Sequence, residues 1–243
     1  MELLKVRDLW VSIGDKEVLK GINLDIPAGE THILFGRNGS GKSTLLMTLM
    51  GFERYRVERG TIVFRGEDIT HLPTFERARR GLGLAFQRPP TIRGVKTGDI
   101  FRACSGGRVD YRTLAAAYDF TDFLDREINY GFSGGEIKRS ELLQLLVQDP
   151  WLVLLDEPES GVDMENLNVV GEIIGKLLQK ERRRENREKS GLIITHTGFI
   201  LDYIDADKGY ILNEGRLCCV GHPRELLKDI KKFGYEECAR CQR

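Results

Sequence analysis

The residues best suited to chemistry form an octet at 36–43, which reads Gly-Arg-Asn-Gly-Ser-Gly-Lys-Ser. The octet fits the pattern G-x-x-x-x-G-K-[ST] and follows an apolar run at 33–35. Glycines let such a loop curl, so that backbone N–H groups and the N-terminus of the next helix face phosphate oxygens. Lys42 would then reach the β and γ oxygens, and the Ser43 hydroxyl would bind Mg²⁺. We therefore expect nine nucleotide-binding residues, namely Gly36, Arg37, Asn38, Gly39, Ser40, Gly41, Lys42, Ser43 and Thr44.

Two adjacent carboxylates, Asp156 and Glu157, follow the apolar run at 151–155. If that run is a buried parallel strand, both carboxylates lie at the carboxyl edge of the sheet, beside the phosphate loop. Asp156 would hold Mg²⁺, and Glu157 would orient or deprotonate the water that attacks the γ-phosphorus. An acidic pair that only caps a helix is the alternative, and the presence of Lys42 and Ser43 argues against it.

The segment Ser133-Gly134-Gly135-Glu136 precedes an amphipathic stretch at 137–148. Serine is a favoured N-cap residue, and an acidic residue in the first turn complements the helix dipole. The same N-terminus attracts anions. Ser133 can therefore cap its own helix, contact a phosphate, or do both.

Gln87 and His196 are each placed at the end of a strand-like run. Gln87 follows the run at 82–86, and His196 follows the run at 192–195, at the sheet edge expected to hold Asp156. A single histidine is more often structural than catalytic. In this ordered set of motifs a functional role is favoured.

Apolar periodicity predicts the elements that position these residues. The chain begins with an antiparallel hairpin at 4–26 that turns at Gly14-Asp15. Strands are then expected at 30–35, 60–66, 82–86, 151–155 and 192–195, with helices at 44–52 and from about 164. Between 89 and 150 the pattern is helical, with helices expected at 97–103, 111–124 and 136–148. A strand, a turn and a helix close the chain.

Composition bears on possible partners. Lys and Arg number 37, as do Asp and Glu, so no overall field draws the chain to nucleic acid or an anionic membrane. No apolar run approaches the roughly 18 to 20 residues that cross a bilayer, and the N-terminus lacks the plan of a signal peptide. Five cysteines, an odd number, suit a reducing compartment. We expect a cytoplasmic protein with no nucleic-acid partner and no direct membrane insertion.

Two further features leave alternatives open. The C-x-x-C of Cys238 and Cys241 is either a metal or redox pair or two free thiols, because no second pair stands at zinc spacing. The charged run at 180–189 is expected to be a solvated helix end with a Glu185–Lys189 pair, or else a patch for an acidic partner.

Taken in order, the motifs resemble those of the ABC-type ATPases: Gly36 to Ser43, Gln87, Ser133 to Glu136, Leu155-Asp156-Glu157, Ser160 to Asp163, and His196. The resemblance implies an α/β P-loop NTPase, a single ABC ATPase domain over 1–243. Its RecA-like core and antiparallel β subdomain would cover 1–88 and 151–243, and the inserted helical signature subdomain would cover 89–150.

The resemblance also implies roles and ligands. ATP and Mg²⁺ would be bound, with Ser43, Gln87 and Asp156 at the metal. Glu157 would be the catalytic base, His196 the γ-phosphate sensor, and Gln87 a third catalytic residue. Two protomers would enclose two ATP molecules in a transient homodimer, each reaching the other's ATP through Ser133, Gly134, Gly135, Glu136 and Asp163.

Some residues depart from the usual transporter pattern. Ile13 stands where many ABC ATPases carry an aromatic residue that stacks on adenine, and Glu136 and Glu159 replace the residues common in transporter subunits. The segments 84–95 and 131–139 are similar to those of the SufC family, the ATPases of iron–sulfur cluster assembly. That similarity implies SufB- or SufD-like scaffold proteins as partners, docked on the helical insertion, with a socket around Ile92.

Two functions remain open on the sequence. The first is an assembly ATPase on a soluble scaffold, and the second is the nucleotide-binding subunit of a membrane transporter whose permease is a separate chain. Both share the same fold and ATP chemistry. A small GTPase or a kinase is disfavoured, because neither explains Ser133 to Glu136 together with His196.

Overall fold

The structure, a computed structural model, describes the backbone of residues 2–240 and the side chains of residues 2–238. Its central sheet has the strand order β10-β9-β3-β8-β7-β6. The pairs of β3 with β8 and β9, and of β7 with β6 and β8, are parallel, and only β9 and β10 pair antiparallel. The strands of this sheet are β3 (Thr31–Phe35), β6 (Leu82–Ala85), β7 (Leu152–Asp156), β8 (Ser190–Ile194), β9 (Lys208–Asn213) and β10 (Arg216–Gly221).

A second sheet has the order β2-β1-β4-β5 and is antiparallel. Its strands are β1 (Glu2–Ile13), β2 (Lys16–Pro27), β4 (Arg56–Phe64) and β5 (Glu67–Asp68). The hairpin expected at 4–26 is confirmed, with its turn at Gly14-Asp15. The strand expected at 60–66 is longer than predicted and begins at Arg56.

The three middle strands of the central sheet, β3, β8 and β7, end at the same edge of the sheet. Every residue of β3, β7 and β8 is buried, as expected for parallel strands covered on both faces. Their carboxyl ends lie at Phe35, Asp156 and Ile194, and Asp156 pairs in register with Ile194. The segments that follow these strands, including the phosphate loop (36–43), therefore meet at a single edge.

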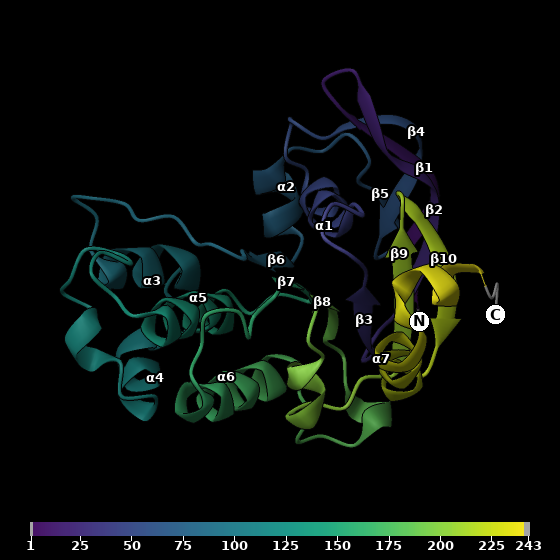
Figure 1. The fold of residues 1–243 in the computed structure, drawn as a ribbon. Helices are drawn as coiled ribbons and strands as arrows, with labels where there is room; N and C mark the ends of the chain where they lie inside the picture. The colour runs from purple at the N-terminus through teal and green to yellow at the C-terminus, as the bar shows by residue number, and fades with distance from the viewer. Residues whose placement is uncertain (1, 241–243) are drawn as a thin grey trace.

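The helices pack beside the sheets as Figure 1 shows, with α3, α4 and α5 forming a lobe at the far side of the molecule from β1 and β2. The lobe and the central sheet share one hydrophobic core, because Phe101, Phe120 and Leu142 cluster with Val153 and Ile193. The helices are α1 (Lys42–Met50), α2 (Thr74–Arg79), α3 (Thr97–Ser105), α4 (Tyr111–Ala117), α5 (Gly134–Gln148), α6 (Met164–Leu177) and α7 (Pro223–Arg240).

The helix predicted over 111–124 is wrong in length. The helix α4 ends at Ala117, and a short 3₁₀ turn covers Thr121–Phe123. Asp119 between them adopts φ 49°, in the left-handed region that stops a helix. The break lets Phe120 turn inward, where its side chain is fully buried.

The charged run at 180–189 is not a helix end, contrary to the prediction. Helix α6 stops at Leu177, and the run contains only a 3₁₀ turn at Arg184–Asn186. Lys189 pairs with Asp149 instead of Glu185, and the side chain of Lys180 is only 14% exposed beside Asp207. Contacts with residues distant in the sequence, which a local pattern does not show, determine the conformation of this segment.

The C-terminal helix α7 reaches back toward the phosphate loop. Its backbone breaks at Gly234, which has φ 78° and ψ 168°, values that suit glycine. Beyond the break, Glu236 forms an ion pair with Arg37 of the phosphate loop.

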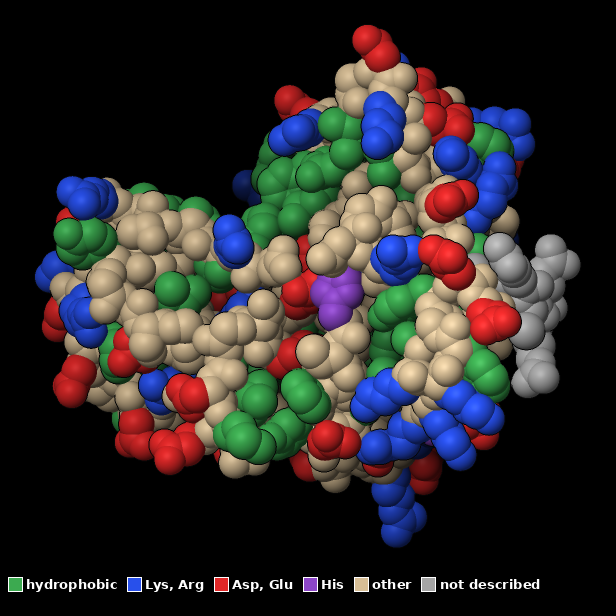
Figure 2. Space-filling model, viewed as in Figure 1, with side chains coloured by type: hydrophobic (Ala, Val, Ile, Leu, Met, Phe, Trp, Pro, Cys, Tyr) green, Lys and Arg blue, Asp and Glu red, His purple; other side chains and the backbone are tan. Residues whose placement is uncertain are grey.

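Surface charge is mixed. On the face in Figure 2, acidic and basic side chains both occur over the helical lobe and over the rest of the molecule. In the described part of the chain, none of the helices combines the length and apolarity needed to cross a membrane.

Candidate functional site

The phosphate loop has the conformation that its glycines allow. Gly39 and Gly41 have φ 79° and 108°, and helix α1 starts at Lys42 directly after them. A Cβ on Gly36 would lie 2.5 Å from the Leu212 carbonyl oxygen, so only glycine fits against β9 there. The loop therefore presents its backbone at the N-terminus of α1, as a phosphate site requires.

Lys42 is buried and points back along the loop. Its Nζ donates to the carbonyl oxygens of Gly36 at 2.8 Å and Arg37 at 3.0 Å. Burial lowers the pKa of Lys42 to about 8, and the nearby carboxylates of Glu157 and Asp156 oppose that change. An ammonium whose hydrogen bonds go to carbonyl oxygens can exchange them for an anion that enters the loop.

Glu157 is the centre of a polar triad. Gln87 Nε2 donates to Glu157 Oε2 at 2.7 Å, and His196 Nε2 lies 2.5 Å from Glu157 Oε1. Glu157 has φ 51°, a conformation that costs a non-glycine residue energy and is found at functional sites. The structure thus brings together three residues that the sequence analysis selected from three separate motifs.

Asp156 has oxygen atoms suited to a divalent cation. Its Oδ1 is buried and has no hydrogen-bond partner among the described residues, and its carboxylate bonds the Ser43 side chain. Burial raises the pKa of Asp156. Mg²⁺ prefers oxygen ligands and is often held by one or two carboxylates plus substrate phosphates. The donor set of Asp156, Ser43 and Gln87 fits that description.

A pocket of about 330 Å³ joins these groups. Six of the nine expected nucleotide-binding residues line it, and the other three, Gly36, Arg37 and Ser40, are not among the lining residues. Val18 on β2 lines the pocket, and Ile13 on β1 is not among the lining residues. The described residues that line the pocket are Val18, Asn38, Gly39, Gly41, Lys42, Ser43, Thr44, Gln87, Glu157 and His196.

The signature segment lies outside that pocket. Ser133 caps α5, with its hydroxyl accepting from the Glu136 N–H at 3.3 Å. The Glu136 carboxylate in turn accepts from the Ser133 N–H at 2.7 Å, which completes a capping box. Ser133 therefore has the capping role foreseen for it, and the N-terminus of α5 is fixed.

Asp163 and the signature glycines lie on neighbouring segments. A Cβ on Gly134 would lie 2.1 Å from the Gly161 carbonyl oxygen, and one on Gly135 would meet the Asn166 side chain at 2.7 Å. Asp163 caps α6 by accepting from the Asn166 N–H at 2.9 Å, which lowers its pKa. The five residues expected to contact a second protomer's ATP are thus adjacent to one another and apart from Lys42.

Sequence reasoning missed two residues near the triad, Lys138 and Glu141. Both lie on the buried face of α5, and their side chains are 4% and 8% exposed. Burial raises the pKa of Glu141 to about 7 and lowers that of Lys138. A lysine and a glutamate at i,i+3 spacing, in line with the apolar Leu142 and Leu145 of the same helix, are the signal that could have identified them.

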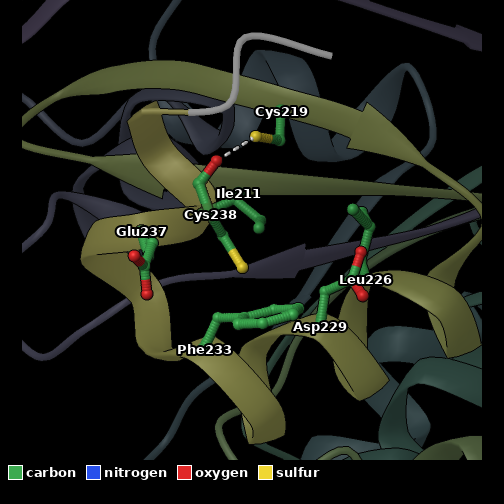
Figure 3. Close-up of a pocket in the computed structure, with 7 residues that line it drawn as sticks. All are labelled: Ile211, Cys219, Leu226, Asp229, Phe233, Glu237 and Cys238. Carbon is green, nitrogen blue, oxygen red and sulfur yellow. Dashed lines mark hydrogen bonds between the residues drawn. The ribbon is translucent and has the colours of Figure 1, made fainter.

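The cysteine prediction for the tail is only partly covered by the structure, because Cys241 lies outside the described residues. Cys238 lines a separate cavity of about 320 Å³ between α7 and the β9–β10 hairpin, shown in Figure 3. There Cys219 Sγ donates to the Cys238 carbonyl oxygen at 2.7 Å. Among the described residues no group of three or more His, Cys, Asp or Glu is arranged to hold a metal ion.

Comparison with known proteins gives concordant results. Residues 19–160 match the ABC transporter family. The chain is 38% identical over 249 residues to a probable ATP-dependent transporter named SufC from Escherichia coli strain K12, covering 96% of this chain and 97% of that protein. It is 37% identical to a probable ATP-dependent transporter, ycf16, from Cyanophora paradoxa, covering 97% and 94%.

A solved structure shows the same arrangement of elements. An ATP-binding cassette of an ABC transporter matches with a TM-score of 0.79 at 22% identity, and the match covers 98% of each chain. At that identity the likeness concerns the fold alone.

Proposed function

We propose that this chain, a member of the ABC transporter family, powers iron–sulfur cluster assembly on a SufB- or SufD-like scaffold. The chain has the ATPase fold of that family and hydrolyses ATP. We place this work in the cytoplasm. The observation that carries the proposal is the nearly full-length similarity to the protein named SufC, at 38% identity. The departures at Glu136 and Glu159 support the same assignment.

The triad supports a role in activating water. In the proposed mechanism Glu157 accepts a proton from the attacking water, and Gln87 and His196 hold its carboxylate oxygens from two sides. Lys42 would bind the β and γ oxygens of ATP through its ammonium group.

Mg²⁺ belongs to the proposal as well. Bound near Asp156, Ser43 and Gln87, it would neutralise charge on the phosphate oxygens. The partnerless Oδ1 of Asp156 supports this assignment.

A second protomer is needed because the pocket is open above Lys42. ATP bound there would gain charge-assisted bonds if the N-terminus of a partner's α5 closed over its γ-phosphate. The clustering of Ser133, Gly134, Gly135, Glu136 and Asp163 on one surface supports this transient, ATP-dependent homodimer. Loss of phosphate would weaken the contact and open the pair.

The scaffold-binding surface is proposed at 88–95, which runs from β6 into the helical lobe. Ile92 is 41% exposed there, and Tyr130 beside it is 50% exposed. The Arg93 guanidinium lies 4.7 Å from the Tyr130 ring centre, so this surface combines apolar and cationic groups. Such a mixture is typical of interface anchors.

The test is a pull-down with this chain as bait, ATP present, from cytosolic and membrane fractions. A soluble partner in stoichiometric amount would support the assembly role, and a polytopic membrane subunit would instead make the chain a transporter motor. Ile92→Asp should abolish partner capture. Val220→Asp is the matched control, because Val220 is 43% exposed on β10, and it should capture as wild type does. Equal capture by both variants would show that the socket is elsewhere.

A further inference from the structure

A buried ion pair on α5 has no part in the function described so far. The Lys138 and Glu141 side chains stand one turn apart, 3.9 Å from each other. Two charges at this depth are unfavourable unless hydrogen bonds satisfy them. Their remaining partners therefore indicate what the pair does.

Those partners are backbone groups at the end of β6. The Phe86 N–H donates to Glu141 Oε1 at 2.6 Å. Lys138 Nζ donates to the Phe86 carbonyl oxygen at 2.6 Å and to the Gln87 carbonyl oxygen at 3.1 Å. The ladder between β6 and β7 ends at Ala85, so side chains of α5 replace ladder bonds at the next two residues.

The backbone held in this way leads directly to the triad. Gln87 carries the amide that donates to Glu157, and it follows the clamped Phe86. We propose that Lys138 and Glu141 are positioning residues of ATP hydrolysis, which orient Glu157 by fixing the Phe86–Gln87 backbone. This inference rests on the roles proposed above for Gln87 and Glu157.

The pair also links the signature segment at the N-terminus of α5 to the Phe86–Gln87 backbone. Helix α5 starts at Gly134, and its cap at Ser133 is part of the surface proposed to meet a second protomer. Because a helix moves as a rigid element, a shift of that N-terminus would reach the Phe86–Gln87 backbone through Lys138 and Glu141.

Steady-state ATPase kinetics of Glu141→Ala is the first test. Loss of the acceptor should lower kcat at least about tenfold, since small misplacements of catalytic groups have effects of this order or larger. KM for ATP should stay within about twofold, because the pair does not touch the phosphate loop. Glu141→Gln keeps an oxygen for the Phe86 N–H and should recover part of the loss. Glu172→Gln, on the exposed side of α6, should behave as wild type.

A double-mutant cycle tests the route through Gln87. If Glu141 acts by placing the Gln87 amide, then Glu141→Ala should cost less than about twofold in a Gln87→Ala background. Wild-type kcat in Glu141→Ala, or losses that simply multiply in the double variant, would overturn the inference.

Hydrogen exchange gives a test that needs no variant. The Phe86 amide of the wild-type protein should exchange slowly although it lies beyond the β6–β7 ladder, and fast exchange there would also overturn the inference.

Glu157→Gln separates the two proposals. If it keeps full turnover, the role of Glu157 fails; if it loses turnover while Glu141→Ala does not, only the positioning role fails.

Discussion

ATP affinity should depend on pH through Lys42. Its pKa of about 8 without nucleotide reflects burial, and the groups that face it are the carboxylates of Asp156 and Glu157. Phosphate oxygens stabilise the ammonium form, so bound ATP should raise this pKa well above 8. Affinity is then fully present below pH 8 and is lost as the pH rises through that value.

The magnitude follows from the protonated fraction of Lys42. With a pKa of about 8, roughly nine tenths of the side chain is charged at pH 7 and roughly one tenth at pH 9. The dissociation constant of ATP should therefore rise about tenfold, or about 1.4 kcal/mol, between these two values. The terminal phosphate of ATP ionises near pH 6 to 7 and so also changes charge at the lower end of this range, a contribution that a variant without the Lys42 titration measures separately.

Calorimetry measures both the affinity and the protons. Titration with ATP in two buffers of different ionisation enthalpy should show uptake of about half a proton per ATP at pH 8. Lys42→Arg is the control, because a guanidinium keeps its charge over this range and should give a flat profile. Equal affinity at pH 7 and pH 9, with no proton uptake at pH 8, would refute the reasoning.

Other predictions concern catalysis and stability. Glu157→Gln should keep ATP binding, lower turnover at least about a hundredfold and trap a dimer seen by gel filtration, because it loses the base; undiminished hydrolysis would exclude that role. Gly134→Ala should lower the free energy of unfolding in urea by about 1–3 kcal/mol, because its Cβ would overlap the Gly161 carbonyl. Gly175→Ala has open space and should not destabilise, so equal effects of the two would contradict the argument. Burial lowers the pKa of Lys180 to about 8, so its charge opposes folding below pH 8 and ceases to do so as the pH rises toward 10.5. Lys180→Met should raise stability at pH 7 by up to about 3 kcal/mol and by less at pH 10, and a less stable variant at pH 7 would show that the contact with Asp207 dominates.

The sequence predicted where the candidate site residues lie better than it predicted their surroundings, for a physical reason. Glycines at 36, 39 and 41 and the carboxylates at 156 and 157 are required by local backbone geometry and by position at a strand end. Residue type and spacing therefore locate them. Gln87 and His196 could be placed at the same edge because each follows a parallel strand.

What the sequence could not show depends on long-range packing. Lys189 meets Asp149, forty positions away, and this contact cannot be foreseen from a run of charges. The left-handed turn at Asp119 is decided by burial of Phe120, while the local pattern favoured a continuing helix. The clamp by Lys138 and Glu141 likewise depends on where α5 packs against β6.

The break of α7 at Gly234 has a consequence for the phosphate loop. Because Glu236 pairs with Arg37, a residue outside every nucleotide-binding motif contacts the phosphate loop. A substitution at Glu236 would therefore remove a contact of the phosphate loop while every motif residue of the ATPase stays the same.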